Sequence, residues 1–273
     1  MRKTLPTAVT AAIGLALVAP LAAAAAAQEG DTAALSVLHG VPDLTVDVYV
    51  DGDLTLDDFT PGSLAGPLEL PAGDYEVAIT AGDAEDDSAP VLGPVDLTLA
   101  GGGDYTAAAH LDAQGNPTVT AFENDTTPVA AGEGRLTVRH IAAAPAVDVW
   151  ADGAVAVPGL ANPDEAALEL PAATLEAAVS MAGTTDPVIG PADVEVAEGV
   201  NTVVYAWGSA TDETLALATQ TVEGLQSAPE NVNAGMAPAA QDDTALYAGA
   251  GVAALALLAG GAMAVRRKAA VRA

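Results

Sequence analysis

The sequence predicts an all-β protein with two tandem β domains, each an antiparallel sandwich or barrel. Three observations lead to this prediction. Apolar and polar residues alternate in many short runs, the pattern of half-buried strands. Gly and Pro separate these runs at a spacing of roughly ten residues, as in sandwiches and barrels. Four sequence blocks also recur in the same order about 100 residues later.

The clearest expected hairpin lies in the first copy. Val46–Val50 alternates valine with Asp47 and Tyr49, so the valines should face a core and Asp47 the solvent. Asp51-Gly52 can adopt the positive φ angles of a tight hairpin turn. The alternation resumes over Leu54–Leu56, which predicts the return strand.

Further alternating runs complete each copy, and helix is expected to be scarce outside the two ends of the chain. These expected strands are Tyr75–Ile79, Leu97–Leu99, Tyr105–Leu111, Val147–Val149, Leu175–Val179, Val194–Val196 and Thr202–Trp207.

The duplication rests on four ordered blocks. Their offset decreases from 101 to 97 residues along the chain, as short loop deletions would produce. LSVLH at Leu35–His39 returns as LTVRH at Leu136–His140, VDVY at Val46–Tyr49 as VDVW at Val147–Trp150, LELPA at Leu68–Ala72 again at Leu168–Ala172, and PVLGP at Pro90–Pro94 as PVIGP at Pro187–Pro191.

The first copy resembles the bacterial family numbered 4397 among the domains of unknown function. Four segments carry this resemblance: Val37–His39, Val46–Gly52, Leu70–Tyr75 and Gly103–Thr106. The resemblance implies exported, often duplicated, Ig-like or transthyretin-like antiparallel β-sandwiches, and it implies no activity. The second copy departs from the pattern, with Ala173 at the turn glycine, Leu175 at the tyrosine and VNT at Val200–Thr202.

Both ends of the chain predict membrane targeting. Arg2 and Lys3 precede an apolar stretch and small residues up to Ala27, the order of a cleaved secretory signal peptide. Leu246–Val265 has no charged residue and is of spanning length, and the basic segment that follows should stay in the cytoplasm. A sortase substrate is the alternative, but the LPxTG motif is absent, so cell-wall attachment is disfavoured.

These observations define the expected organisation. The protein should be a single-pass protein of the cell membrane, with its N-terminal domains extracellular. The segments are a signal peptide at 1–27, a first β-sandwich repeat at 28–123, a linker at 124–134, a second repeat at 135–222, a flexible acidic stalk at 223–245, a transmembrane helix at 246–265 and a basic cytoplasmic tail at 266–273.

The exterior part is strongly acidic. All 37 acidic residues lie between Glu29 and Asp243, where Arg135 and Arg139 are the only basic residues, so the formal charge there is −35. This charge argues against a nucleic-acid partner, because phosphates require a basic face. The chain has no cysteine, so the domains must be stabilised by burial alone.

Two kinds of residue are candidates for chemistry. His39 and His140 occupy equivalent strand ends, and we interpret them as structural residues whose rings bond to a nearby loop backbone. Metal binding or proton transfer is the alternative. The acidic run Asp51–Asp58 could coordinate Ca²⁺, but it lacks EF-hand spacing, so a solvated loop is the preferred interpretation. The same applies to a second acidic run, whose metal-ligand candidates are Asp83, Glu85, Asp86 and Asp87.

No hydrolase motif such as G-x-S-x-G or S-x-x-K occurs, so we predict no catalytic residue, no cofactor and no enzyme activity. The predicted function is display of two acidic β domains for adhesion, spacing or envelope interaction, with an unidentified envelope or protein partner. The alternative is a ligand-binding module for Ca²⁺ or carbohydrate. Weak divalent-cation binding and sugar stacking on Tyr49 and Trp150 belong to that alternative.

Overall fold

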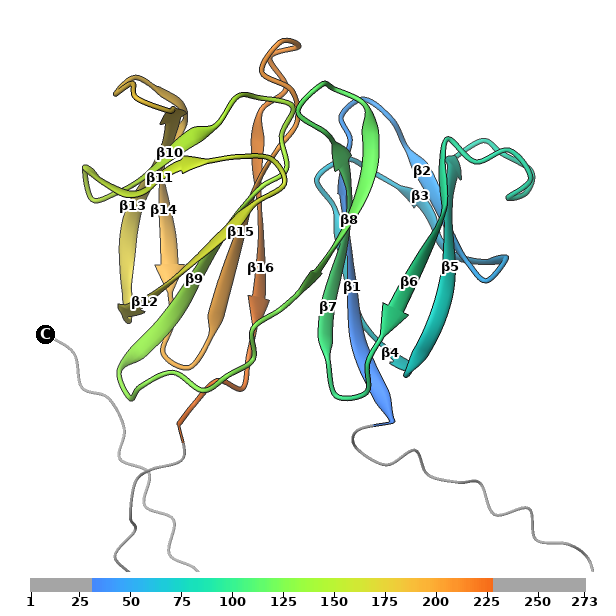
Figure 1. Ribbon diagram of the computed structural model, residues 1–273, viewed down its shortest axis with the longest axis horizontal. Coiled ribbons are helices and arrows are strands. Elements are labelled where there is room, and N and C mark those ends of the chain that lie inside the picture. Colours follow the sequence, from blue (N-terminus) through green and yellow to red (C-terminus); the bar gives the residue numbers. More distant parts are fainter. Residues whose placement is uncertain (1–30, 228–273) are drawn as a thin grey trace, which may run out of the picture. The chain divides into compact units, whose positions relative to one another are not determined.

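The computed structural model describes residues 31–227, which fall within one compact unit (Figure 1). These residues form sixteen strands and no helix, as the sequence predicts. The predicted signal peptide, transmembrane helix and basic tail lie outside the described residues, as does most of the predicted stalk. From residue 31 to residue 227 no helix has the length and apolarity needed to cross a membrane.

The first half of this unit is a pair of four-stranded sheets. One sheet has the strand order β3-β2-β5-β6 and the other the order β4-β1-β7-β8. Their bounds are β1 Thr32–Gly40, β2 Val46–Val50, β3 Asp53–Phe59, β4 Leu64–Pro71, β5 Gly73–Ala81, β6 Leu92–Leu99, β7 Asp104–Leu111 and β8 Pro117–Glu123.

The second half repeats this arrangement. Its sheets have the orders β11-β10-β13-β14 and β12-β9-β15-β16, so each strand corresponds to the one eight places earlier. The bounds are β9 Glu133–His140, β10 Val147–Ala151, β11 Ala154–Leu160, β12 Glu165–Pro171, β13 Ala173–Met181, β14 Pro187–Val196, β15 Asn201–Trp207 and β16 Ala216–Val222.

The sheets differ from the predicted antiparallel sandwich in one pairing per half. β1 pairs with β7 in parallel, and β9 pairs with β15 in the same way. Parallel neighbours need a long crossover connection. Here the chain supplies it by forming β2, β3, β5 and β6 of the opposite sheet, and β4 of its own sheet, before it returns to β7.

Each half has its own apolar core between its two sheets. Because aromatic residues make up only 3% of the chain, valine, leucine and alanine fill most of this space. The first core includes Leu35, Val37, Val46, Val48, Ile79 and Leu99, and the second includes Leu136, Val138, Val147, Val149, Val179 and Val204.

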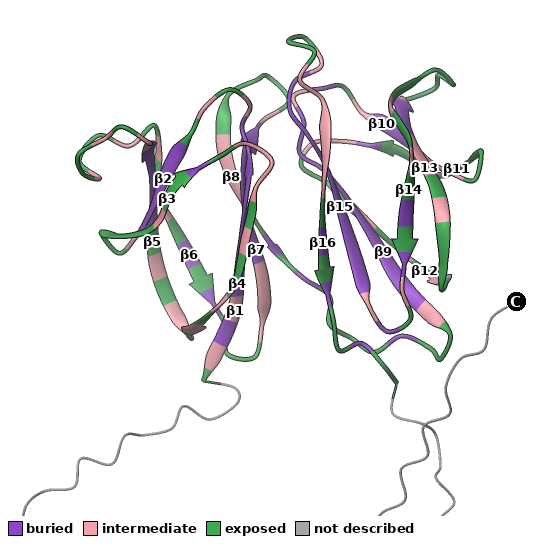
Figure 2. Cartoon of the chain, turned by 180° about the vertical axis from the view of Figure 1, so that it is seen from behind, coloured by how far each residue is buried: buried purple, intermediate pink, exposed green. Residues whose placement is uncertain are grey.

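A third apolar cluster joins the two halves, and we call it the junction. It brings Leu38, Ala108 and Phe122 of the first half together with Tyr205 and other residues of the second. The strands that carry it are therefore buried on both faces, as the continuous burial of β7, β9 and β15 shows (Figure 2). The sequence-based expectation of half-buried strands is wrong for these strands, because the junction covers the face expected to meet solvent.

The segments next to the junction make contacts of their own. Within the predicted linker 124–134, Val129 is buried and its backbone N–H donates to the Leu225 carbonyl at 2.9 Å. Asp125 forms an ion pair with the buried Arg135 at 3.0 Å. Leu225 lies in the predicted stalk 223–245 but is fully buried, so the fold extends at least to this residue.

Candidate functional site

The hairpin turn at Asp51-Gly52 has the predicted conformation, and the equivalent turn at Asp152-Gly153 shares it. Asp51 and Gly52 have φ angles of 51° and 82°, and the equivalent pair has 48° and 76°. Positive φ at both positions is the signature of a type I′ turn. Asp51 Oδ1 also accepts the Glu76 backbone N–H at 2.8 Å, and Asp152 binds the backbone of Glu176 in the same way. Asp51 therefore has a structural role in the turn.

Asp47 and Asp148 correct the sequence-based expectation. Asp47 was expected to face solvent, but Asp47 and its equivalent Asp148 are only 3% and 8% exposed. The reason is a bulge in the neighbouring strand, where two residues oppose one and a backbone N–H loses its ladder partner. Asp47 Oδ1 accepts the freed Asp58 N–H at 2.8 Å, and Asp148 Oδ1 accepts that of Gly159 at 2.8 Å.

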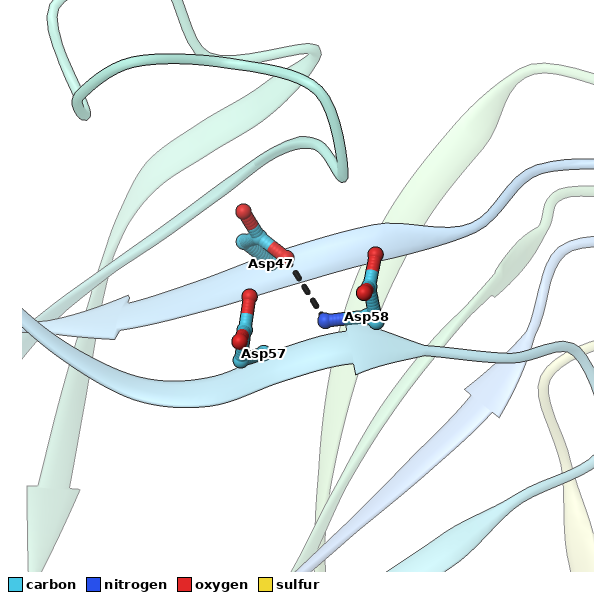
Figure 3. A group of neighbouring side chains, drawn as sticks. All are labelled: Asp47, Asp57 and Asp58. Atoms are coloured by element: carbon cyan, nitrogen blue, oxygen red, sulfur yellow. Dashed lines mark hydrogen bonds between the residues drawn. The ribbon is translucent and has the colours of Figure 1, made fainter.

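The bulge in β3 also builds a group of carboxylates. Asp57 and Asp58 both lie opposite Asp47, and one oxygen of each of the three residues lies within 4.8 Å of the others (Figure 3). We call this group the aspartate cluster. It is the only such group of potential metal ligands among residues 31–227. Sequence reasoning included Asp57 and Asp58 in an acidic run but did not connect them to Asp47, because the bulge has no clear sequence signal.

The loop between β5 and β6 holds the predicted metal-ligand candidates Asp83, Glu85, Asp86 and Asp87. The structure does not gather these four into a common group of ligand atoms among the residues it describes. Asp86 accepts the Ser88 backbone N–H at 3.0 Å, and its hydrogen bonds to Ser88 lower the pKa of its carboxyl. Asp86 therefore stabilises its own loop.

The loop still contributes charge near the aspartate cluster. Burial, followed by the negative charges of Asp47, Asp87, Asp86 and Asp57, raises the pKa of the Tyr49 hydroxyl. The carboxylates of the loop thus belong to the same local field as those of β2 and β3.

The histidines behave as predicted from the sequence. The His39 ring donates from Nε2 to the Leu44 carbonyl at 2.6 Å, and His140 donates to the Pro145 carbonyl at 3.1 Å. Both residues are only 1% exposed, and burial lowers the pKa of each ring. The rings therefore stay neutral near pH 7 and hold the loops that follow β1 and β9.

Arg139 is the largest buried polar side chain of the junction, with 1% exposure. Its Nε donates to Glu165 Oε2 at 2.7 Å, and its Nη1 donates to the Tyr205 hydroxyl at 2.7 Å. Its guanidinium carbon lies 4.3 Å from the ring centre of Phe122, a cation–π contact that reaches from the second half to the first.

A chain of buried hydrogen bonds continues across the junction. The Tyr205 hydroxyl donates to Gln220 Oε1 at 2.5 Å, and burial raises the pKa of this hydroxyl. Thr106 of the first half donates to the same oxygen at 3.0 Å. Asn124 then links Thr106 to Asp104, at 3.0 Å and 2.6 Å. These directional hydrogen bonds thus help to fix the orientation of one half against the other.

Concave surfaces elsewhere on residues 31–227 include a wide groove and a pocket. A wide groove of about 940 Å³ lies beside the junction and is lined by Glu123, Asp125, Asp164 and Glu165, with Phe122 among them. A smaller pocket of about 310 Å³ lies against Trp150. The Trp150 indole N–H donates to Ser180 at 2.9 Å, and the equivalent Tyr49 is buried, so cross-strand packing accounts for both aromatic side chains.

No curated protein shows significant sequence similarity to the chain. The match to the family covers the first half and the start of the second, so the resemblance of the rest of the second repeat stays a prediction. Residues 33–150, which run from β1 to Trp150 in β10, match the family described as a domain of unknown function (DUF4397), and the resemblance predicted from the sequence is confirmed over these residues.

Proposed function

We propose that the protein is a non-enzymatic, membrane-anchored surface protein that presents residues 31–227 as one acidic β module. The observation that carries this proposal is the junction. A shared apolar cluster and a buried hydrogen-bond chain fix the two halves to each other. Such a module suits adhesion, spacing or an envelope contact, because it holds its outer surface at a fixed geometry on a stalk.

The state of the polar side chains supports a non-enzymatic role. His39 and His140 are buried, and Nε2 of each ring donates to a loop carbonyl, so neither ring is accessible to a substrate. Arg135 and Arg139 are engaged with carboxylates. These two histidines and two arginines thus serve the fold.

The charge of the exterior part supports display at a surface. A formal charge of −35 between Glu29 and Asp243, where 37 acidic residues face two arginines, repels other anionic surfaces and keeps the module in solution. The expected anchor is the apolar segment Leu246–Val265 with its basic flank. A basic envelope component is the kind of partner that this charge would attract.

Cell fractionation tests the anchor. The protein should sediment with membranes and be released by detergent, while digestion of the cell wall should leave it in the membrane fraction. Proteolysis of intact cells should remove the acidic module, because the module is proposed to lie outside. Release by wall digestion alone would show covalent wall attachment and contradict the proposal.

A further inference from the structure

The equivalent buried aspartates Asp47 and Asp148 differ in their hydrogen bonds. In the second half, Asp148 uses both oxygens, since Oδ1 accepts the Gly159 N–H and Oδ2 accepts the Gly183 N–H, each at 2.8 Å. In the first half, Asp47 Oδ1 accepts the Asp58 N–H. Its Oδ2 has no hydrogen-bond donor among the described residues and keeps only slight contact with solvent, since Asp47 is 3% exposed. A carboxylate oxygen in this position favours a positive partner.

A second buried group beside Asp47 also lacks a partner. Thr80 lies directly opposite Asp47 in the register of β2 and β5, as Ser180 lies opposite Asp148. The Thr80 hydroxyl is fully buried and has no hydrogen-bond partner among residues 31–227. Directly paired residues project from the same face of a sheet, so this hydroxyl lies on the side of the sheet that carries the Asp47 carboxylate.

The second half shows how the same hydroxyl position is satisfied without a ligand. Ser180 Oγ accepts the Trp150 indole N–H at 2.9 Å and donates to the Thr184 carbonyl at 2.8 Å. The first half has Tyr49 in place of Trp150, and tyrosine has no ring N–H to offer. Asp148 Oδ2 and Ser180 Oγ thus have hydrogen-bond partners in the second half, whereas the equivalent oxygens of Asp47 and Thr80 have none in the first.

The same place in the first half has gained negative charge. Asp57 and Asp58 stand where the second half has Pro158 and Gly159. Three carboxylates within 4.8 Å repel one another. Around Asp47 the first half therefore has fewer hydrogen-bond donors and more carboxylates than the second half has around Asp148. This combination is typical of a cation site, and the second half is the reference for comparison.

From these differences we propose that Asp47, Asp57 and Asp58, with the Thr80 hydroxyl, bind one divalent cation of the Ca²⁺ type, and that the second half has no equivalent site. Ca²⁺ takes six to eight oxygen ligands in flexible geometry, including carboxylates and water. Asp57 and Asp58 are exposed, so water completes the coordination from the outer side. This inference goes beyond the display role and does not depend on it.

The position of the site gives the cation a structural effect. A side chain built on Gly82 would meet Asp58 Oδ1 at 3.2 Å, so the start of the β5–β6 loop passes close to the cluster. The ion therefore connects β2, the bulge of β3 and the end of β5. The loop carboxylates of Asp86 and Asp87 add long-range attraction without being ligands.

Calorimetric titration of the intact chain tests the site. The 273-residue protein in detergent, freed of metal by a chelator, is titrated with CaCl₂ at constant ionic strength. The wild type should show saturable binding of one ion. In Asp57→Asn/Asp58→Asn, loss of two charged ligands should weaken binding by about tenfold or more. Asparagine has nearly the same volume and tolerates the positive φ of Asp58.

The matched control is Asp193→Asn/Glu195→Gln, which removes the same charge from the exposed surface of β14 in the second half. Its affinity for Ca²⁺ should stay within about twofold of wild type, since diffuse attraction contributes little at fixed ionic strength. Without Ca²⁺, the cluster variant should melt at or above the wild-type temperature because repulsion is relieved. Equal weakening in both variants, or no saturable binding in the wild type, would overturn the proposal.

Discussion

Arg139 shows how one residue can connect two halves of a protein. Its guanidinium is almost fully buried, yet its ion-pair partner Glu165 is 43% exposed at the side chain. Water screens such a pair, so the ion pair itself contributes little. The stronger contributions come from the Tyr205 hydrogen bond and the packing against Phe122.

Replacing Arg139 by alanine should lower the free energy of unfolding by about 2–4 kcal/mol, because it leaves a cavity and removes the hydrogen bond that the guanidinium donates to the Tyr205 hydroxyl. Glu165→Gln should cost less than about 1 kcal/mol. Urea unfolding of both variants of the intact chain measures the difference. Equal costs would mean that the ion pair dominates the contribution of Arg139.

The hairpin turns illustrate what a short element requires of its residues. Gly153 has a φ of 76°, and a side chain built on it would meet nothing within 4 Å. Gly73 also has open space but no positive φ. Comparing substitutions at Gly153 and Gly73 therefore isolates the effect of a positive φ, because neither position is crowded.

Gly153→Ala should destabilise the protein by about 1–2 kcal/mol through the left-handed backbone alone. Gly73→Ala should be neutral or slightly stabilising, since alanine restricts the unfolded chain more than glycine. Thermal unfolding of the two variants provides the comparison. A neutral Gly153→Ala would show that the turn relaxes without cost.

The same elements show what the sequence could predict. Local patterns were sufficient for the Val46–Val50 strand, the Asp51-Gly52 turn and the ring–carbonyl bonds of the histidines. The solvent exposure of Asp47 and the half-buried character of β9 were predicted wrongly. Both depend on contacts between distant segments, a bulge in one case and the junction in the other. Alternation within a strand cannot show whether its second face meets solvent.

At the scale of the whole molecule, the junction should make the two halves unfold together. Scanning calorimetry of the intact chain should show a single transition for the β module, with calorimetric and van't Hoff enthalpies in agreement. Ala108→Glu places a charge at a fully buried junction position and should split or broaden this transition. Ala100→Glu, at an exposed loop position, should leave it single. Two transitions in the wild type would show that the halves are independent.

The junction also has an evolutionary consequence, because the faces that meet in it are equivalent faces of the two repeats. The registers place Leu38 at the position of Arg139, Ala108 at that of Tyr205, and Phe122 at that of Gln220. In an association of two identical subunits through this face, every substitution would appear on both sides at once. Tandem duplication within one chain removes that restriction. An arginine can then arise on one side and an aromatic ring on the other, so the two surfaces can diverge into complementary partners while each repeat keeps its own core.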